Sequence, residues 1–296
     1  MNMATIINLN GEDRLLNELL AKLTETYDIE WVYCFSKNTV NTVTSGSFLE
    51  NTDNFSCHYF LLIITDGTSN MMHHIQEFAN NNFDYGKVTI IVHARETLTD
   101  ALRKKNIFFS QAVGSGQLLY AKNGMMLKQE VQTDEATTSE KELKAMRRYM
   151  HRYELAEIFR DCALDCIGKD HHKAALFLLH QSMEQCCKAL LNVYLDYKPD
   201  IHRLGWLIDL TLCFSDEPYA LFPRRTEEEK RLFMVLQNSY TQARYNDSFK
   251  VTAVDVSLIY NQVLGFLYVT KDLCLLKMPQ LKIEKPETIV IEDQVA

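Results

Sequence analysis

Two stretches of this sequence decide its fold: residues 180–191, HQSMEQCCKALL, and residues 240–245, YTQARY. Both lie within a long region in which apolar residues recur at helical spacing. Glycine and proline interrupt this region at Gly168, Pro199, Pro218 and Pro223. The resulting pattern predicts about five helices, at 142–168, 171–196, 201–214, 225–245 and 254–277. The sequence therefore predicts an all-α, up-and-down helical bundle over residues 142–278.

The N-terminal part of the chain mixes strand-like and helical patterns. Short runs of β-branched and aromatic residues predict strands at 30–35, 58–65, 87–93 and 118–120. Amphipathic runs that begin after residues 14, 70 and 96 predict helices before and between these strands. Residues 128–140 are polar and acidic, which predicts a linker at 122–141, and residues 279–296 form a short tail. The predicted class is α+β, with a small mixed-sheet domain at 1–121 followed by the bundle.

Composition excludes several classes of protein. The hydrophobic content of 47% and the charged content of 24% are typical of a globular chain. A net charge of -8 argues against a protein that coats nucleic acid generally. The sequence shows no signal peptide and no apolar run long enough to span a bilayer, so we expect a cytoplasmic protein without a membrane partner. The eight cysteines are expected to be reduced, small buried hydrophobes.

The helical region resembles the HEPN family of small helical bundles, which bind nucleotides or cut RNA. The family's second helix has an apolar entry, then Gln, Glu and Lys-Ala-Leu, as in Gln181, Glu184 and 188–190 here. His202 and Leu204 stand where the family has His and Leu at the start of the next helix, and 238–246 matches a stretch that ends in Ala-Arg-Tyr. The resemblance implies a homodimer through the bundle.

The ribonucleases of that family carry a His shortly after the Arg of this last stretch. Such a His would move a proton while the Arg stabilises charge on the phosphate. The corresponding positions here hold Phe249, Lys250 and Val251, and no His follows His202. Asp247 is an unfavourable base because its charge would repel a phosphate. The resemblance therefore implies a bundle without this catalytic residue.

The candidate ligand-binding residues are Arg244, Tyr240, Tyr245, His202 and Lys188. Arg244 would hold a phosphate, or it would pair with Glu184 or Asp247 to fix the bundle. The two tyrosines would stack on a base, or they would pack between helices. His202 would face a nucleotide, or it would cap a helix. His180 is expected to be a hydrogen-bonded core residue.

The N-terminal domain resembles the minimal nucleotidyltransferases that often accompany HEPN bundles. That family has a Gly-Ser turn, then an Asp-x-Asp pair and a third Asp, which together hold two metal ions. Here Gly46-Ser47-Phe48 precedes His58 and Phe60 at the Asp positions, and the third strand begins at Lys87. Placing the turn at Phe35-Ser36 instead does not change this result. We expect no metal, no cofactor and no transferase activity.

Three functions remain from the sequence. The first is a non-catalytic regulatory protein that binds a nucleotide or RNA. The second is a toxin-like HEPN ribonuclease with a non-standard site. The third is a structural or protein-interaction module without nucleotide affinity.

Overall fold

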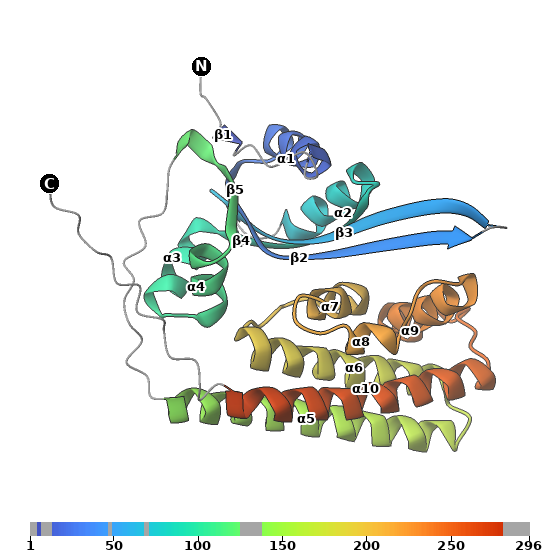
Figure 1. The fold of residues 1–296 in the computed structure, drawn as a ribbon. Helices are drawn as coiled ribbons and strands as arrows, with labels where there is room; N and C mark the ends of the chain where they lie inside the picture. Colours follow the sequence, from blue (N-terminus) through green and yellow to red (C-terminus); the bar gives the residue numbers. More distant parts are fainter. Residues whose placement is uncertain (1–4, 7–13, 47–48, 68–70, 125–137, 281–296) are drawn as a thin grey trace, which may run out of the picture. The chain divides into compact units, whose positions relative to one another are not determined.

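The computed structural model describes residues 5–6, 14–46, 49–67, 71–124 and 138–280 (Figure 1). The predicted class is confirmed, since a mixed sheet comes first and helices follow. Contacts divide the chain into two compact units, one of residues 1–129 and 195–220 and the other of 130–194 and 221–296. The predicted bundle helix at 201–214 therefore falls in the unit of the sheet.

The sheet has the strand order β1 (Thr5–Ile6), β5 (Gln117–Ala121), β2 (Ile29–Gly46), β3 (Leu49–Thr65) and β4 (Gly86–Ala94). Neighbouring strands are antiparallel except β3 and β4, which are parallel. β2 and β3 extend well beyond the predicted strands. The sequence did not predict their outer halves because these are rich in Asn and Thr and lack the apolar pattern of a strand. Ser47 and Phe48 of the predicted turn lie outside the described residues.

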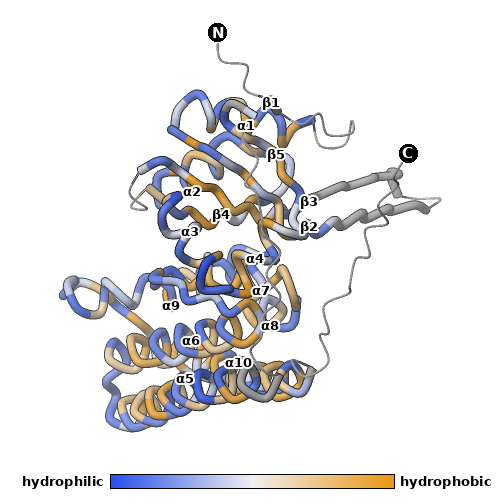
Figure 2. The backbone as a smooth tube through the Cα atoms, turned by 90° about the vertical axis from the view of Figure 1, so that its left-hand side faces the viewer, coloured by the Kyte–Doolittle hydropathy of each residue, from blue (hydrophilic) through white to orange (hydrophobic). Residues whose placement is uncertain are grey.

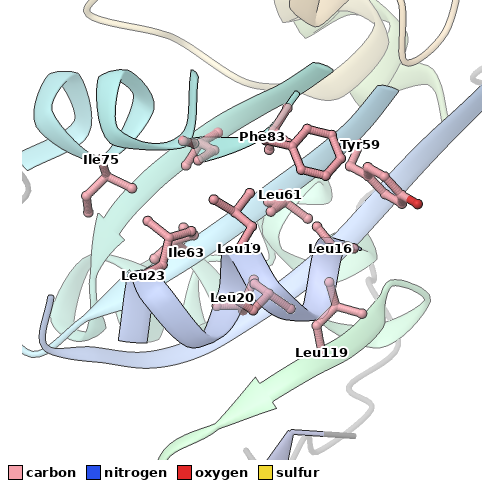
Figure 3. Close-up of a cluster of buried hydrophobic side chains, with 14 of the residues drawn as sticks. Leu16, Leu19, Leu20, Leu23, Tyr59, Leu61, Ile63, Ile75, Phe83 and Leu119 are labelled. Atoms are coloured by element: carbon pink, nitrogen blue, oxygen red, sulfur yellow. The ribbon is translucent and has the colours of Figure 1, made fainter. Parts of the chain in front are cut away.

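Helices α1 (Arg14–Thr26) and α2 (Met72–Asn82) cover one face of this sheet. Four leucines of α1 and Ile75 of α2 pack with Leu61 and Ile63 of β3 (Figure 3). Gln76 fastens α2 to the edge strand, because its amide donates to the Val88 carbonyl and accepts from the Ile90 N–H, both at 2.8 Å. Apolar packing and the hydrogen bonds of Gln76 therefore both hold α2 against this face of the sheet.

The opposite face carries Phe60, Leu62 and Ile64, which are fully buried. The tube in Figure 2 is hydrophobic along β4 at the centre of this unit. The sheet also contacts α3 (Arg95–Arg103), α4 (Ile107–Gly114) and α7 (Leu204–Thr211). α7 is fixed to β4 by Trp206, whose indole N–H donates to the Ile90 carbonyl at 3.2 Å. The short helix α8 (Glu217–Ala220) contacts α7.

The helical patterns expected from 97 to about 112 form two helices in the structure, α3 and α4. Lys105 has a φ of 53°, which ends α3, and Asn106 caps α4 by accepting from the Phe109 N–H. The left-handed residue turns the chain, so that Phe108 and Phe109 reach an aromatic cluster with Tyr197.

His93 of β4 lies in this cluster. Its Nε2 lies 3.1 Å from the Tyr197 hydroxyl, and its ring contacts Phe109. Burial lowers the pKa of His93 to about 4, and the nearby Asp200 opposes this shift only in part.

An unfolded chain would take up a proton at His93 near pH 6.5, whereas the folded chain does so only near its lowered pKa. The free energy of unfolding should therefore fall as the pH drops below 6.5, by about 2 kcal/mol at pH 5. Urea unfolding at pH 7 and pH 5 measures this loss, and His93→Gln should remove it. Equal losses in the wild type and the variant would contradict the assignment to His93.

The second unit is built on α5 (Thr138–Ile167), α6 (His172–Leu195), α9 (Glu227–Tyr245) and α10 (Ala253–Gln280). α6 is the central helix, because it is buried without interruption from Ser182 to Val193. Two serines hold it close to its neighbours: Ser182 donates to the Ala156 carbonyl at 2.8 Å, and Ser239 donates to the Leu176 carbonyl at 3.1 Å. A capping box of Thr226 and Glu229 starts α9.

The predicted linker and tail differ partly from the structure. The 3-10 turn Lys122–Gly124 and the first turns of α5 occupy its two ends, while 125–137 lies outside the described residues. α10 extends to Gln280, and 281–296 also lies outside them.

Among the described helices, α10 is the one that is long and apolar enough to cross a membrane, with a mean hydropathy of 1.2 over its most apolar window. It packs along α5 and buries Val256, Ile259, Val263 and Phe266. Only 39% of that stretch is buried, and Leu258, Tyr268 and Leu276 of α10 are exposed, so its place in the bundle accounts for part of this apolar character.

Candidate functional site

Arg244 lies at the end of α9 among three aromatic rings. Its guanidinium carbon is 4.3 Å from the centre of Tyr240, 5.0 Å from Tyr245 and 5.4 Å from Phe177. Its Nε donates to the Tyr240 carbonyl one turn earlier at 2.7 Å, which fixes the side chain against its own helix. Tyr245 is 78% exposed, so the cluster presents an aromatic face and a cation to solvent. We call these four residues the Arg244 cluster.

The packing of α6 against α9 brings the residues of the Arg244 cluster together. The hydrogen bond from Ser239 to Leu176 brings the two helices together next to it. Tyr240 and Arg244 are one turn apart on α9, and Phe177 and His180 are one turn apart on α6, so each pair lies on one helix face. The ring of His180 lies 5.1 Å from that of Tyr240 and is fully buried, as expected for a core histidine.

The ion pair considered for Arg244 is wrong. Within the part of the chain that the structure describes, Arg244 contacts no carboxylate. The Glu184 carboxylate accepts from Lys188 at 2.8 Å. A charged guanidinium without an acidic partner, stacked on exposed rings, can accept a phosphate or stack on a base.

Lys188 has a different environment from Arg244. It lies one turn after Glu184 on the buried part of α6, and the side chains of Lys188 and Glu184 are 11% and 2% exposed. A buried ammonium needs its counter-charge, so this contact fixes Lys188 within the unit. The geometry favours a structural role for Lys188.

His202 is exposed and lies two residues before α7, in the unit of the sheet. The residue that stands at the cap position of α7 is Arg203, not His202. Tyr240 and Tyr245 belong to the other unit together with Arg244.

An open cleft of about 650 Å³ lies where the turn before α6 meets the loop after α9, and no residue of the Arg244 cluster lines it. The turn contributes Asp170, His171, His172, Lys173 and Ala174, and the loop contributes Asp247, Phe249, Lys250 and Val251. Lys173 joins the two walls, because its ammonium donates to the Asp247 carbonyl at 2.8 Å. The positions expected to hold the ribonuclease His thus line a cleft whose histidines come from another segment.

In the sheet unit, His58, Phe60 and Lys87 stand where the transferase family has carboxylates, and each of them contacts another residue of this unit. His58 stacks on Phe60 at 4.2 Å, and its Nε2 lies 2.8 Å from the Thr89 hydroxyl. At the start of β4, Lys87 pairs with Asp209 of α7. No group of three or more metal-ligating side chains occurs within the described ranges. The Asp209 carboxylate lies at the start of β4, which sequence spacing could not predict, and it forms an ion pair with Lys87.

Residues 149–273 match the HEPN domain family. This part of the chain is a HEPN domain. The match covers α6, α9 and the Arg244 cluster, so the resemblance read from 180–191 and 240–245 is confirmed.

Two further comparisons add no relative on which an argument can rest. The solved structure of a nucleotidyltransferase-like protein from Exiguobacterium sibiricum 255-15 aligns with 93% of this chain and 81% of its own, at 10% identity and a TM-score of 0.28. So low a score gives no ground for a shared fold or activity. No curated protein matches the chain. The transferase resemblance of the N-terminal unit stays a prediction.

Sequence reasoning missed Phe177 and the cleft histidines. Phe177 was part of an apolar run and carried no polar signal. His171 and His172 were distant in sequence from Arg244, and the α6 to α9 packing alone brings their segment to the same end of the unit.

Proposed function

We propose that this protein is a regulatory protein that binds a nucleotide or RNA at the Arg244 cluster of its HEPN domain without cleaving it. One observation carries the proposal: an exposed end of α9 holds a guanidinium on three aromatic rings with no carboxylate among its described contacts. Aromatic faces that stack on bases and an arginine that contacts phosphate are the recurring elements of single-strand recognition.

The loop after Arg244 supports binding over cleavage. Its residues 246–252 contain no histidine, so the group that would transfer a proton is missing from that segment. The exposed apolar side chains of α5 and α10, such as Met150, Ile158, Leu258 and Leu276, support the further proposal of a homodimer through the bundle.

The test is a fluorescence anisotropy titration of a labelled single-stranded RNA, with ATP, GTP and UTP as competitors. Arg244→Ala should weaken binding at least about tenfold, because it removes both the charge and the stacked plane. Arg225→Ala, which removes an exposed arginine just before the other end of α9, is the matched control and should leave binding unchanged. Equal affinities of Arg244→Ala and the wild type would contradict the proposal.

The RNA recovered after the titration gives a second readout. Intact RNA is the expected result. Shortened RNA whose cleavage depends on Arg244 would favour a ribonuclease instead, with His171 and His172 as the candidates for proton transfer.

A further inference from the structure

The first half of α5 and the last turns of α10 carry an exposed surface that is both apolar and basic. The two helices pack antiparallel, so that the end of α10 lies beside the start of α5 (Figure 1). The exposed side chains there include Leu143 and Met150 of α5 and Leu275 and Leu276 of α10. Arg147 is also exposed and lies between Leu143 and Met150 on the same face of α5. We call these five residues the α5–α10 patch.

The charge around this patch is opposite in sign to that of the whole chain. Residues 142–152 and 271–280 together contain six lysines and arginines but three aspartates and glutamates. The whole chain, in contrast, has a net charge of -8. A contiguous apolar surface on a globular protein is commonly covered by another segment or partner. The positive charge around this one favours a covering segment that is apolar and acidic.

The residues that follow α10 include a segment with this chemistry. Residues 287–295 read ETIVIEDQV, with three consecutive β-branched apolar residues at 289–291, three carboxylates and no lysine or arginine. The six residues 281–286 separate this segment from the end of α10 at Gln280 and span at most about 20 Å when extended. Leu276 lies about 6 Å along the helix axis from that end. The segment is therefore close enough in the chain to reach the patch.

We propose that residues 287–295 pack on the α5–α10 patch of their own chain. The apolar residues of the segment cover the leucines and Met150 of the patch, and its carboxylates lie near Arg147. This inference goes beyond the nucleotide or RNA site proposed above. Met150 and Leu276 also belong to the face proposed above for the homodimer, so the docked segment competes with a second copy for these two residues.

The test is hydrogen–deuterium exchange of the full chain, with a synthetic peptide of residues 281–296 as the reference. In the wild type, the amides of 287–295 should exchange at least about tenfold more slowly than in the peptide, because docking protects them. Arg147→Glu should remove most of this protection, because it places a carboxylate near those of the segment. Lys169→Glu reverses an exposed charge just beyond the other end of α5 and should leave the protection unchanged.

A charge exchange gives a second readout, which a general loss of stability would not produce. Glu292→Lys and Asp293→Lys, combined with Arg147→Glu, should restore the protection, because opposite charges then lie near each other again. Equal protection in the wild type and Arg147→Glu, or exchange in the wild type as fast as in the peptide, would overturn the proposal. Protection that increases with protein concentration would identify binding to a second copy and would overturn docking within one chain.

Sedimentation equilibrium tests the competition with the homodimer, which rests on the dimer face proposed above. Ile289→Ser combined with Ile291→Ser should release the segment and lower the dimer dissociation constant by about three- to tenfold, because Met150 and Leu276 become accessible. A loss of protection with an unchanged dissociation constant would overturn the competition. A monomeric variant would contradict the homodimer, whereas the exchange results decide the docking independently.

Discussion

Replacing Lys188 with alanine is expected to lower the free energy of unfolding of the helical unit by about 3 kcal/mol. The substitution would leave the Glu184 carboxylate, which is 2% exposed, without the ammonium that contacts it at 2.8 Å. A buried charge that loses its partner costs far more than an exposed one. Urea unfolding followed by circular dichroism measures the loss.

The matched control keeps the volume and removes both charges. Glu184→Gln combined with Lys188→Met should recover most of the lost stability, because neither a buried carboxylate nor a buried ammonium then remains at these two positions. A loss below about 1 kcal/mol for Lys188→Ala would contradict the structural role and return Lys188 to the candidate ligand-binding residues.

Gly86→Ala is expected to destabilise the sheet unit by about 2–3 kcal/mol. Gly86 begins β4 with a φ of +151°, and a Cβ atom there would lie 2.0 Å from the Cys57 carbonyl oxygen of β3. The obstacle is backbone in a parallel strand pair, so a side chain cannot simply move away. The substitution should therefore separate the beginning of β4 from β3.

Gly67→Ala provides the control, because a Cβ at Gly67 meets no atom within 4 Å. Its melting temperature should stay close to that of the wild type, while that of Gly86→Ala should fall by several degrees. Similar melting temperatures for both variants would contradict the close approach of Gly86 to the Cys57 carbonyl.

The fold class was predictable because its signals are local. Helical spacing of apolar residues marks each long helix of the second unit, and alternating or continuous apolar runs mark the inner halves of β2, β3 and β4. The placement of α7 was not predictable. Its pattern is that of any buried helix, and its position depends on Trp206 and Asp209 reaching β4, which are contacts between distant residues.

The residues of the candidate site were also predictable only in part. Arg244, Tyr240 and Tyr245 were accessible to sequence reasoning, since they form one short motif at the end of a helix. The chemistry around them was not, because Phe177 and the cleft histidines come from α6 and its preceding turn. Lys188 matched the family pattern, but its burial beside Glu184 is a property of the packed unit.

In the function proposed above, the Arg244 cluster serves a ligand and does not hold the bundle together. Thermal denaturation of the wild type and Arg244→Ala, each with and without saturating single-stranded RNA or nucleotide, tests this claim directly. We predict nearly equal melting temperatures without ligand, and a ligand-dependent rise in the wild type that Arg244→Ala loses. A lower melting temperature of the variant without ligand, together with an unchanged ligand-dependent rise, would contradict the account.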